Sequence, residues 1–124
     1  MIRALLAPST PDTVRPLLAP SVAFHSPVAD YRGRDDVAHL LATIGRCLTD
    51  PEPGQRCEAE RRRFEEFTAH VGDHPVDGVL IRRTGPEGLI EELTLFVRPL
   101  EPLQIAVAIM RDALRADPLP SRRR

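Results

Sequence analysis

The sequence predicts an α+β protein in which a mostly antiparallel sheet packs against helices. Strand-like segments follow one another in the second half of the chain and are joined by short turns, an order typical of antiparallel pairing. In the hairpin predicted at 76–98, the second strand is apolar at nearly every position, so we expect both of its faces to be covered. Two other segments, 35–48 and 102–116, carry apolar residues at helical spacing.

The first half of the chain predicts two helices with one strand between them. Pro11 suits the first turn of a helix, and the acidic pair Asp35 and Asp36 complements the positive end of another helix. A stretch rich in Pro and Gly then interrupts the pattern. In order, the sequence predicts a helix at 9–19, a strand at 20–26, a loop at 27–34, a helix at 35–48 and a linker at 49–56.

The second half predicts the sheet and a closing helix. The Gly-Pro-Glu-Gly sequence at 85–88 is typical of a hairpin turn. Pro102 opens the final helix, and we expect the short tail after it to be disordered. In order, the elements are a segment at 58–63 that fits either a helix or a strand, a strand at 64–71, a turn at 72–75, the hairpin at 76–98, a helix at 102–116 and a disordered tail at 117–124. We therefore expect one domain over residues 1–116.

Composition and charge argue against several classes of function. A chain of 124 residues is long enough for one domain with a core and too short for two. The formal net charge of −1 gives no global field that would attract nucleic acid or an anionic membrane. No segment approaches the roughly 20 apolar residues of a membrane-spanning helix. We therefore expect neither nucleic acid nor membrane as a partner.

The cysteines and histidines indicate no metal site. Cys47 and Cys57 do not form a CxxC pair, and neither they nor His70 and His74 have the spacing of a zinc ligand set. We expect two free thiols, no metal and no cofactor. Because no early stretch has the basic start and cleavage site of a secretory signal, the sequence predicts a cytoplasmic protein.

Two segments resemble a known group of folds. Residues 24–41, FHSPVADYRGRDDVAHLL, and residues 77–100, DGVLIRRTGPEGLIEELTLFVRPL, resemble the SnoaL-like and nuclear transport factor 2-like superfamily, and the order of elements extends the resemblance over about residues 17–115. The resemblance implies a cone in which a curved, mostly antiparallel sheet wraps around helices. It also implies a pocket on the concave side and a homodimer through the outer sheet face. The superfamily includes ketosteroid isomerase, polyketide cyclases, limonene epoxide hydrolase and non-catalytic binders, so the fold alone does not give the function.

The residues that carry isomerase chemistry in such proteins are missing from the matching positions. Ketosteroid isomerases place a general-base Asp before a Pro, where this chain has Ser26 before Pro27. They place a protonated Asp, which donates to an oxyanion, at the position that matches Leu80. Their Tyr lies in a longer first helix, whereas the only tyrosine here, Tyr31, is expected in a loop. The resemblance therefore argues against isomerase chemistry of that type.

The acid of limonene epoxide hydrolase is missing as well. That enzyme keeps an acidic residue in its last strand, and the matching residue here is Leu95. A register shifted by one residue would bring Thr94 or Phe96 to the position, and neither is an acid.

The residues predicted to face inward from the sheet are mostly apolar. This lining favours a pocket for an apolar small molecule, and the small residues Ala69 and Gly78 leave room for one. The same lining also fits a filled core without a cavity. By alternation, the inward positions are Phe67, Ala69 and Val71, then Gly78, Leu80 and Arg82, then Leu93, Leu95 and Val97.

Five polar residues are candidates for binding or catalysis. His25 titrates near neutrality and is the best candidate acid or base, although alternation places only one of His25 and Ser26 inward and a structural histidine is the simpler interpretation. Tyr31 could donate to a ligand carbonyl or pack against the rim. Glu65 and Arg82 are expected inward as a rim ion pair that orients a polar ligand end or only supports the structure.

Three functions fit the sequence. The first is binding of an apolar small molecule without ketosteroid isomerase-type catalysis. The second is a cyclase, isomerase or hydratase that acts on a polyketide- or terpene-like substrate, with His25 or Tyr31 as the proton-handling group. The third is a structural dimerisation module, which would have a filled cone. The predicted ligand-binding residues are Ser26, Tyr31, Glu65, Phe67, Ala69, Leu80, Arg82, Leu93, Leu95 and Val97.

Overall fold

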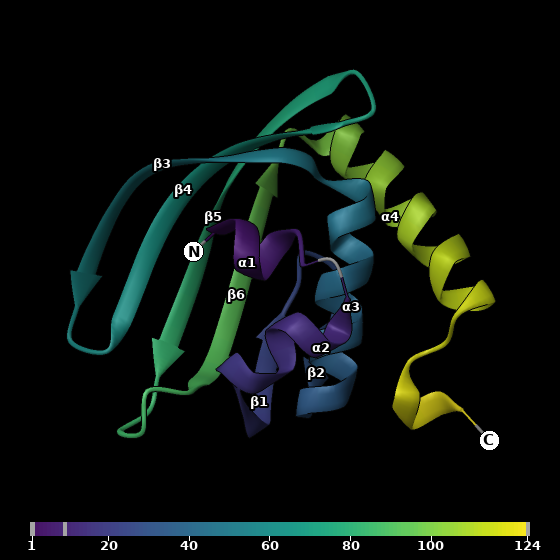
Figure 1. The fold of residues 1–124 in the computed structure, drawn as a ribbon. Helices are drawn as coiled ribbons and strands as arrows, with labels where there is room; N and C mark the ends of the chain where they lie inside the picture. The colour runs from purple at the N-terminus through teal and green to yellow at the C-terminus, as the bar shows by residue number, and fades with distance from the viewer. Residues whose placement is uncertain (1, 9, 124) are drawn as a thin grey trace.

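The fold is built from one curved sheet and four α-helices in the described part of the chain, residues 2–8 and 10–123 of a computed structural model (Figure 1). The strands are β1 (Leu18–His25), β2 (Asp30–Arg32), β3 (Thr49–Ala59), β4 (Arg62–Val71), β5 (His74–Thr84) and β6 (Ile90–Arg98). The helices are α1 (Ile2–Leu6), α2 (Pro11–Val14), α3 (Arg34–Cys47) and α4 (Leu100–Ala116), with 3₁₀ turns η1 (Arg15–Leu17) and η2 (Pro120–Arg122).

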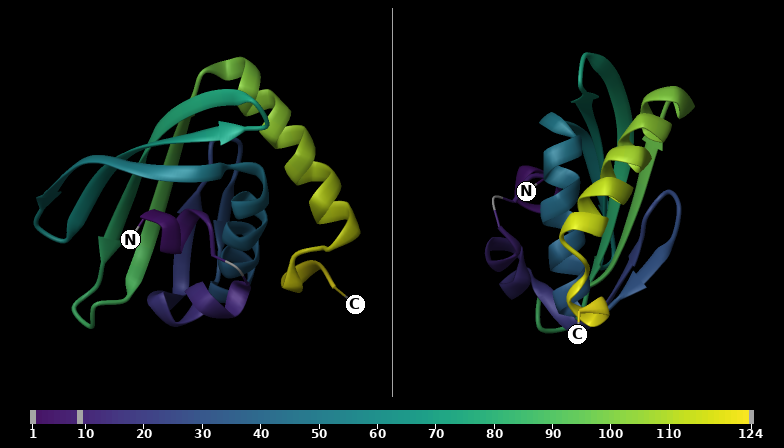
Figure 2. Two further views of the ribbon diagram at one scale, coloured as in Figure 1. Left: turned by 45° about the horizontal axis from the view of Figure 1, so that its top comes forward. Right: turned by 90° about the vertical axis from the view of Figure 1, so that its right-hand side faces the viewer.

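The predicted α+β architecture is confirmed. The strands form a single sheet in the order β2-β1-β6-β5-β4-β3, in which β1 pairs with β6 in parallel and every other pair is antiparallel. The sheet curves around α1, α2 and α3, which lie on its concave side, while α4 leaves the end of β6 and runs away from the sheet (Figures 1 and 2). The concave side therefore holds the core.

Buried and exposed side chains alternate along the strands and show which face of the sheet packs against the core. In β4, Phe67, Ala69 and Val71 are buried and the residues between them are exposed. The strand thus has one face on the core and one toward solvent. In contrast, α3 is buried over most of its length because the sheet, α1, α2 and α4 surround it. The core is continuous from α1 through α3 to the sheet.

Two segments that the sequence assigns to loops are strands. The predicted linker at 49–56 is the first part of β3, an edge strand that pairs only with β4. Prolines are tolerated at a sheet edge because their missing N–H need not join a ladder, which explains why Pro51 and Pro53 misled the prediction. The predicted loop at 27–34 contains β2, the opposite edge strand.

The prediction at the start of the chain is also corrected. The helix expected at 9–19 is shorter, because α2 and η1 end at Leu17 and β1 begins at the next residue; residue 9 lies outside the described residues. A helix that was not predicted, α1, buries Ile2, Leu5 and Leu6 almost completely. The ambiguous segment at 58–63 holds the turn between β3 and β4.

The last segment of the chain turns back from α4 to α3. His39 Nε2 lies 2.8 Å from the backbone oxygen of Asp117, and the backbone N–H of Ser121 donates to Asp36 over 3.0 Å. Leu119 is 7% exposed and belongs to the core. The expected disorder of residues 117–124 stays a prediction, and residue 124 lies outside the described residues.

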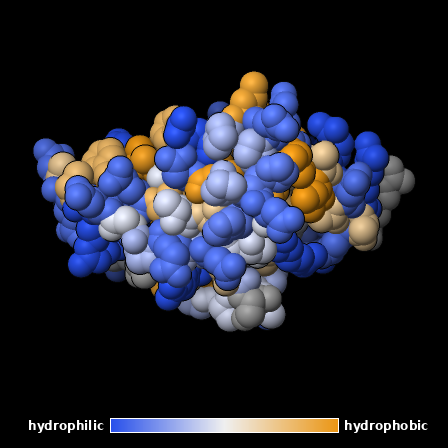
Figure 3. Space-filling model, turned by 90° about the horizontal axis from the view of Figure 1, so that it is seen from above, coloured by the Kyte–Doolittle hydropathy of each residue, from blue (hydrophilic) through white to orange (hydrophobic). Residues whose placement is uncertain are grey.

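The surface gives no sign of a membrane-crossing helix. Over residues 2–8 and 10–123, no helix is both long and apolar enough to span a bilayer. Seen from above, the molecule is mostly hydrophilic, and its apolar side chains form separate small patches (Figure 3).

Candidate functional site

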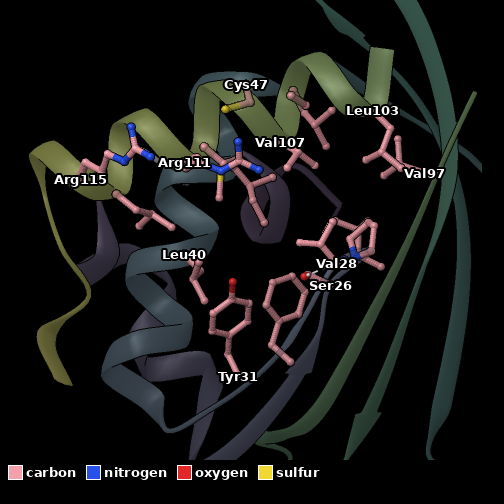
Figure 4. A pocket seen from close by; sticks show the side chains of 18 residues that line it. Ser26, Val28, Tyr31, Leu40, Cys47, Val97, Leu103, Val107, Arg111 and Arg115 are labelled. Carbon is pink, nitrogen blue, oxygen red and sulfur yellow. Dashed lines mark hydrogen bonds between the residues drawn. The ribbon is translucent and has the colours of Figure 1, made fainter. Parts of the chain in front are cut away.

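A cavity of about 460 Å³ lies between α3, α4 and the β1–β2–β6 end of the sheet (Figure 4). Its volume falls within the range of about 300–1,000 Å³ that is common for small-molecule sites. The lining residues are Phe24, Ser26, Pro27, Val28, Tyr31, Leu40, Ile44, Cys47, Leu48, Leu95, Val97, Leu103, Ala106, Val107, Met110, Arg111, Leu114 and Arg115.

The position of α4 creates this cavity. Its apolar stripe, which includes Leu103, Val107, Met110 and Leu114, faces the space, and these four side chains stay only half-buried. Within α4, only Pro102 and Ala106 are buried. An apolar helical face normally packs fully against its neighbour, so the helix covers a space that its own side chains do not fill.

Aromatic residues form the floor of the cavity. Phe24 is completely buried, and its ring stacks on that of Tyr31 with centroids 6.4 Å apart. Tyr31 stands in β2, and its hydroxyl points into the cavity (Figure 4). That hydroxyl makes no hydrogen bond to any described residue, so it is available to a ligand.

Ser26 lines the cavity, but a turn already uses its hydroxyl. The hydroxyl donates to the backbone oxygen of Ala29 over 2.8 Å and accepts from the backbone N–H groups of Ala29 at 3.0 Å and Val28 at 3.3 Å. These bonds close the turn between β1 and β2. Ser26 therefore has a structural role in the loop and no adjacent base that would activate it.

Three further lining residues carry a polar or ionisable group. Burial raises the pKa of the Cys47 thiol, although nearby Arg46 opposes the shift, so the thiol stays protonated at neutral pH. Arg111 and Arg115 both come from α4, one helical turn apart, and line the same space (Figure 4). The charged groups of the cavity lie therefore on its α4 wall.

His25 lies outside the cavity, on the outer face of the sheet. Its Nδ1 is 2.8 Å from Asp30 Oδ1 and its Nε2 is 3.1 Å from Glu92 Oε2. The hydrogen bond to Asp30 and then that to Glu92 raise the pKa of His25. The same contact with His25 lowers the pKa of Glu92, helped by the charge of Arg83. His25 is therefore part of a surface charge cluster and does not reach a ligand in the cavity.

Only some of the predicted ligand-binding residues surround the cavity. Ser26, Tyr31, Leu95 and Val97 line it. The others are buried in the neighbouring part of the concave side and are not among its lining residues: Glu65, Phe67, Ala69, Leu80, Arg82 and Leu93. The room that was expected at Gly78 is occupied, because a Cβ there would lie 2.8 Å from Phe67 Cζ.

Glu65 and Arg82 are both buried, with 5% and 8% exposure, in the part of the sheet away from α4. No ion pair joins them within 4.0 Å in the described part of the chain. Burial lowers the pKa of Arg82, and the like charge of Arg63 lowers it further. The two residues thus lie in the interior near each other without forming the rim pair expected from the sequence.

Sequence reasoning missed the helical walls of the cavity. Helices α3 and α4 together supply more than half of the lining residues, including Leu40 and Ile44 on α3 and the apolar stripe of α4. Their helical spacing was visible in the sequence, and the excess of apolar residues on the last helix was the available signal. The spacing does not reveal whether such a stripe meets a core or an open space.

Comparison with solved structures places the fold. An uncharacterised protein with a cystatin-like fold from Silicibacter pomeroyi DSS-3 matches with a TM-score of 0.87 and 23% identity, over 94% of this chain and 84% of the other. A steroid delta-isomerase from Pseudomonas aeruginosa matches with a TM-score of 0.81 and 27% identity, over 86% and 80%. A protein of the SnoaL-like family from Agrobacterium tumefaciens str. C58 matches with a TM-score of 0.60 and 13% identity, over 72% and 80%.

These matches identify the class of fold. No protein-family model and no curated protein sequence matches the chain. The chain has the same fold as SnoaL-like and nuclear transport factor 2-like proteins of known structure, the likeness that its sequence predicts.

Proposed function

We propose that the protein binds a small apolar molecule in the cavity between α3 and α4, without ketosteroid isomerase-type catalysis. The observation that carries this proposal is a space of about 460 Å³ with walls made mostly of aliphatic and aromatic side chains. Transfer of an apolar ligand from water into such a space is favourable by roughly 25 cal/mol per Å² of buried apolar surface.

The absence of isomerase chemistry is supported by the residues at the matching positions. The Ser26 hydroxyl is hydrogen-bonded to the backbone of Ala29 in the β1–β2 turn. Leu80 is an apolar residue with 1% exposure that does not line the cavity. The steroid delta-isomerase with a similar structure is therefore an argument for the shape of the site and not for its reaction.

A second function rests on Tyr31. Its hydroxyl points into the cavity and could donate a proton or a hydrogen bond to a carbonyl of a polyketide- or terpene-like substrate. Under this function, Tyr31→Phe abolishes turnover of such a carbonyl compound and leaves its binding unchanged. The third function, a purely structural module, requires a filled cone, and the cavity argues against it.

We also propose a homodimer through the outer face of the sheet. Phe64, Ile81 and Thr94 lie side by side across β4, β5 and β6, and Val79 lies opposite Phe96, which is 57% exposed. A two-fold axis would place this apolar patch against its own copy. Light scattering should find a dimer that Phe96→Arg converts to a monomer, while Ile109→Arg on α4 leaves it unchanged. A monomeric wild-type protein contradicts this proposal.

The location in the cell is proposed from the cysteines. Cys47 and Cys57 are both free, as is usual in a reducing cytosol. We propose a cytoplasmic protein on this ground.

Ligand binding is tested by thermal shift with decan-1-ol and naphthalene. A ligand that binds only the folded state raises the melting temperature. Val107→Trp places a large ring in the cavity and should remove the shift, whereas Ile109→Trp, on the exposed side of the same helix, should retain it. An absent shift in the wild-type protein, or an equal shift in Val107→Trp, contradicts the proposed function.

A further inference from the structure

The charge of the cavity differs from that of the whole chain. The chain carries 18 acidic residues against 17 arginines and is nearly neutral. Among the cavity-lining residues, Arg111 and Arg115 are the only ones with a permanent charge, and no described carboxylate lines the space. Two cationic groups on otherwise apolar walls attract an anionic group more strongly than the net charge of the protein suggests.

The two arginines are only weakly neutralised by the protein. Arg111 forms no ion pair with a described residue. Arg115 Nη1 lies 3.8 Å from Asp112 Oδ1, and both side chains are more than 70% exposed, at 75% and 79%. A pair this exposed contributes little, so both guanidinium groups remain available to a ligand.

Helix electrostatics explain one arginine and not the other. Arg115 stands in the last turn of α4, where a cation complements the negative end of the helix dipole. Arg111 lies a full turn earlier, beside the apolar stripe of Met110 and Leu114. Because residues four apart share a helical face, the two guanidinium groups form one cationic edge along the cavity.

We propose that the natural ligand is an apolar carboxylate, whose hydrocarbon part fills the cavity and whose carboxylate pairs with Arg111 and Arg115. This inference rests on the proposed binding function and deepens it. The planar guanidinium matches a carboxylate through two parallel hydrogen bonds, which suits arginine better than any other cation for this task. The hydrocarbon part then contacts Leu40 and Leu95 on the opposite walls and Val107 on α4 itself.

The test compares decanoate with decan-1-ol by isothermal titration calorimetry, with decanoate kept below its micelle concentration. The two probes share a chain and differ in the charge of the head. The wild-type protein should bind decanoate about fivefold more tightly than decan-1-ol. The double variant Arg111→Gln/Arg115→Gln should lose this preference and bind the two probes with similar affinity.

A matched control removes the same charge elsewhere. Arg61→Gln/Arg62→Gln changes two exposed arginines at the β3–β4 turn, far from α4 (Figure 1). This variant should keep the preference for decanoate, which separates a local contact from a change in net charge.

Each outcome separates the inference from the function on which it rests. Equal binding of decanoate and decan-1-ol, or an unchanged preference in the Arg111/Arg115 variant, overturns the carboxylate while the binding function stands. If neither probe binds the wild-type protein, both the proposed function and the inference are wrong.

Discussion

The two faces of the sheet differ in the side chains that they carry, and consecutive residues of β1 show the difference. Phe24 is fully buried on the concave side and lines the cavity. His25, the next residue, lies on the outer face, where Asp30 and Glu92 contact its ring. Because side chains alternate along a strand, neighbouring residues meet an apolar space and a charged surface.

This separation bears on function. His25 lies outside the space for a ligand, and the two carboxylates that contact its ring lie outside as well. Inside, the proton-bearing groups of the lining are Ser26, whose hydroxyl is bonded to the β1–β2 turn, Tyr31, a protonated Cys47 and the two arginines of α4. The concave side is thus better equipped to hold a ligand than to move a proton at neutral pH.

The largest contrast between the faces is expected for two phenylalanines. Phe24→Ala removes a side chain with 0% exposure, whereas Phe96→Ala removes one that is 57% exposed. We expect Phe24→Ala to lower the free energy of unfolding by about 3–5 kcal/mol, and Phe96→Ala by about 0.5 kcal/mol or less. Urea denaturation, at concentrations too low for dimer formation, measures both. Similar losses in the two variants would contradict the assignment of the faces.

A smaller effect is expected at Gly78, where the concave side is filled. A Cβ at this position would lie 2.0 Å from the backbone oxygen of Phe96 and 2.8 Å from the ring of Phe67. We expect Gly78→Ala to cost about 1–3 kcal/mol of unfolding free energy, because overpacking forces neighbouring atoms to move. An unchanged denaturation midpoint would mean that this part of the concave side has room after all.

The C-terminal segment allows a test of the α3–α4 side of the cavity. Ser121→Ala removes the hydrogen bond that the Ser121 hydroxyl donates to Asp36 and keeps the one from its backbone N–H. A hydrogen bond of this kind contributes about 0.5–1.5 kcal/mol. Ser21→Ala, at an exposed serine of β1, serves as the control. If residues 117–124 are disordered, as their sequence suggests, the two variants will have the same stability.

The smallest effect is a pH dependence on the outer face. The pKa of His25 is raised from its ordinary value of 6.5, so its contacts stabilise the fold below that pH and lose this contribution as pH rises through the raised pKa. The pKa of Glu92 is lowered from 4.5, so its contribution is present above 4.5 and is lost as pH falls through the lowered value.

The corresponding experiment is an NMR titration of the His25 ring. Asp30→Asn and Glu92→Gln should each lower the pKa of His25, with the larger change for Asp30→Asn because that hydrogen bond is the main cause of the shift. Binding of a cavity ligand should leave this titration unchanged. A ligand-dependent pKa would place His25 closer to the site than its contacts do.

Much of the fold could be predicted because local patterns specify it. The alternation in β4 and the helical spacing of α3 each indicate which face meets the core. The edge strand β3 was missed because its prolines are typical of a linker, and only its position beside β4 makes them compatible with a sheet.

The candidate site was less predictable, for a physical reason. The sheet residues were expected to surround a pocket, but the ring of Phe67 fills the room above Gly78. The actual space depends on how far α4 stands from α3, which no local pattern encodes. Some residues that were predicted to face a pocket from the alternation along the strands, such as Leu80 and Leu93, therefore lie in the packed part of the interior. Leu95 and Val97 do line the cavity.

Binding of an apolar molecule in the cavity between α3 and α4 is tested most directly by methyl NMR mapping with decan-1-ol. Leu40, Leu95 and Val107 line the cavity, and Val79 and Ile81 lie on the outer face of the sheet. We expect saturable shifts at the three cavity residues and none at Val79 and Ile81. Shifts confined to the outer face, or no saturable shift at the cavity residues, would contradict binding in the cavity.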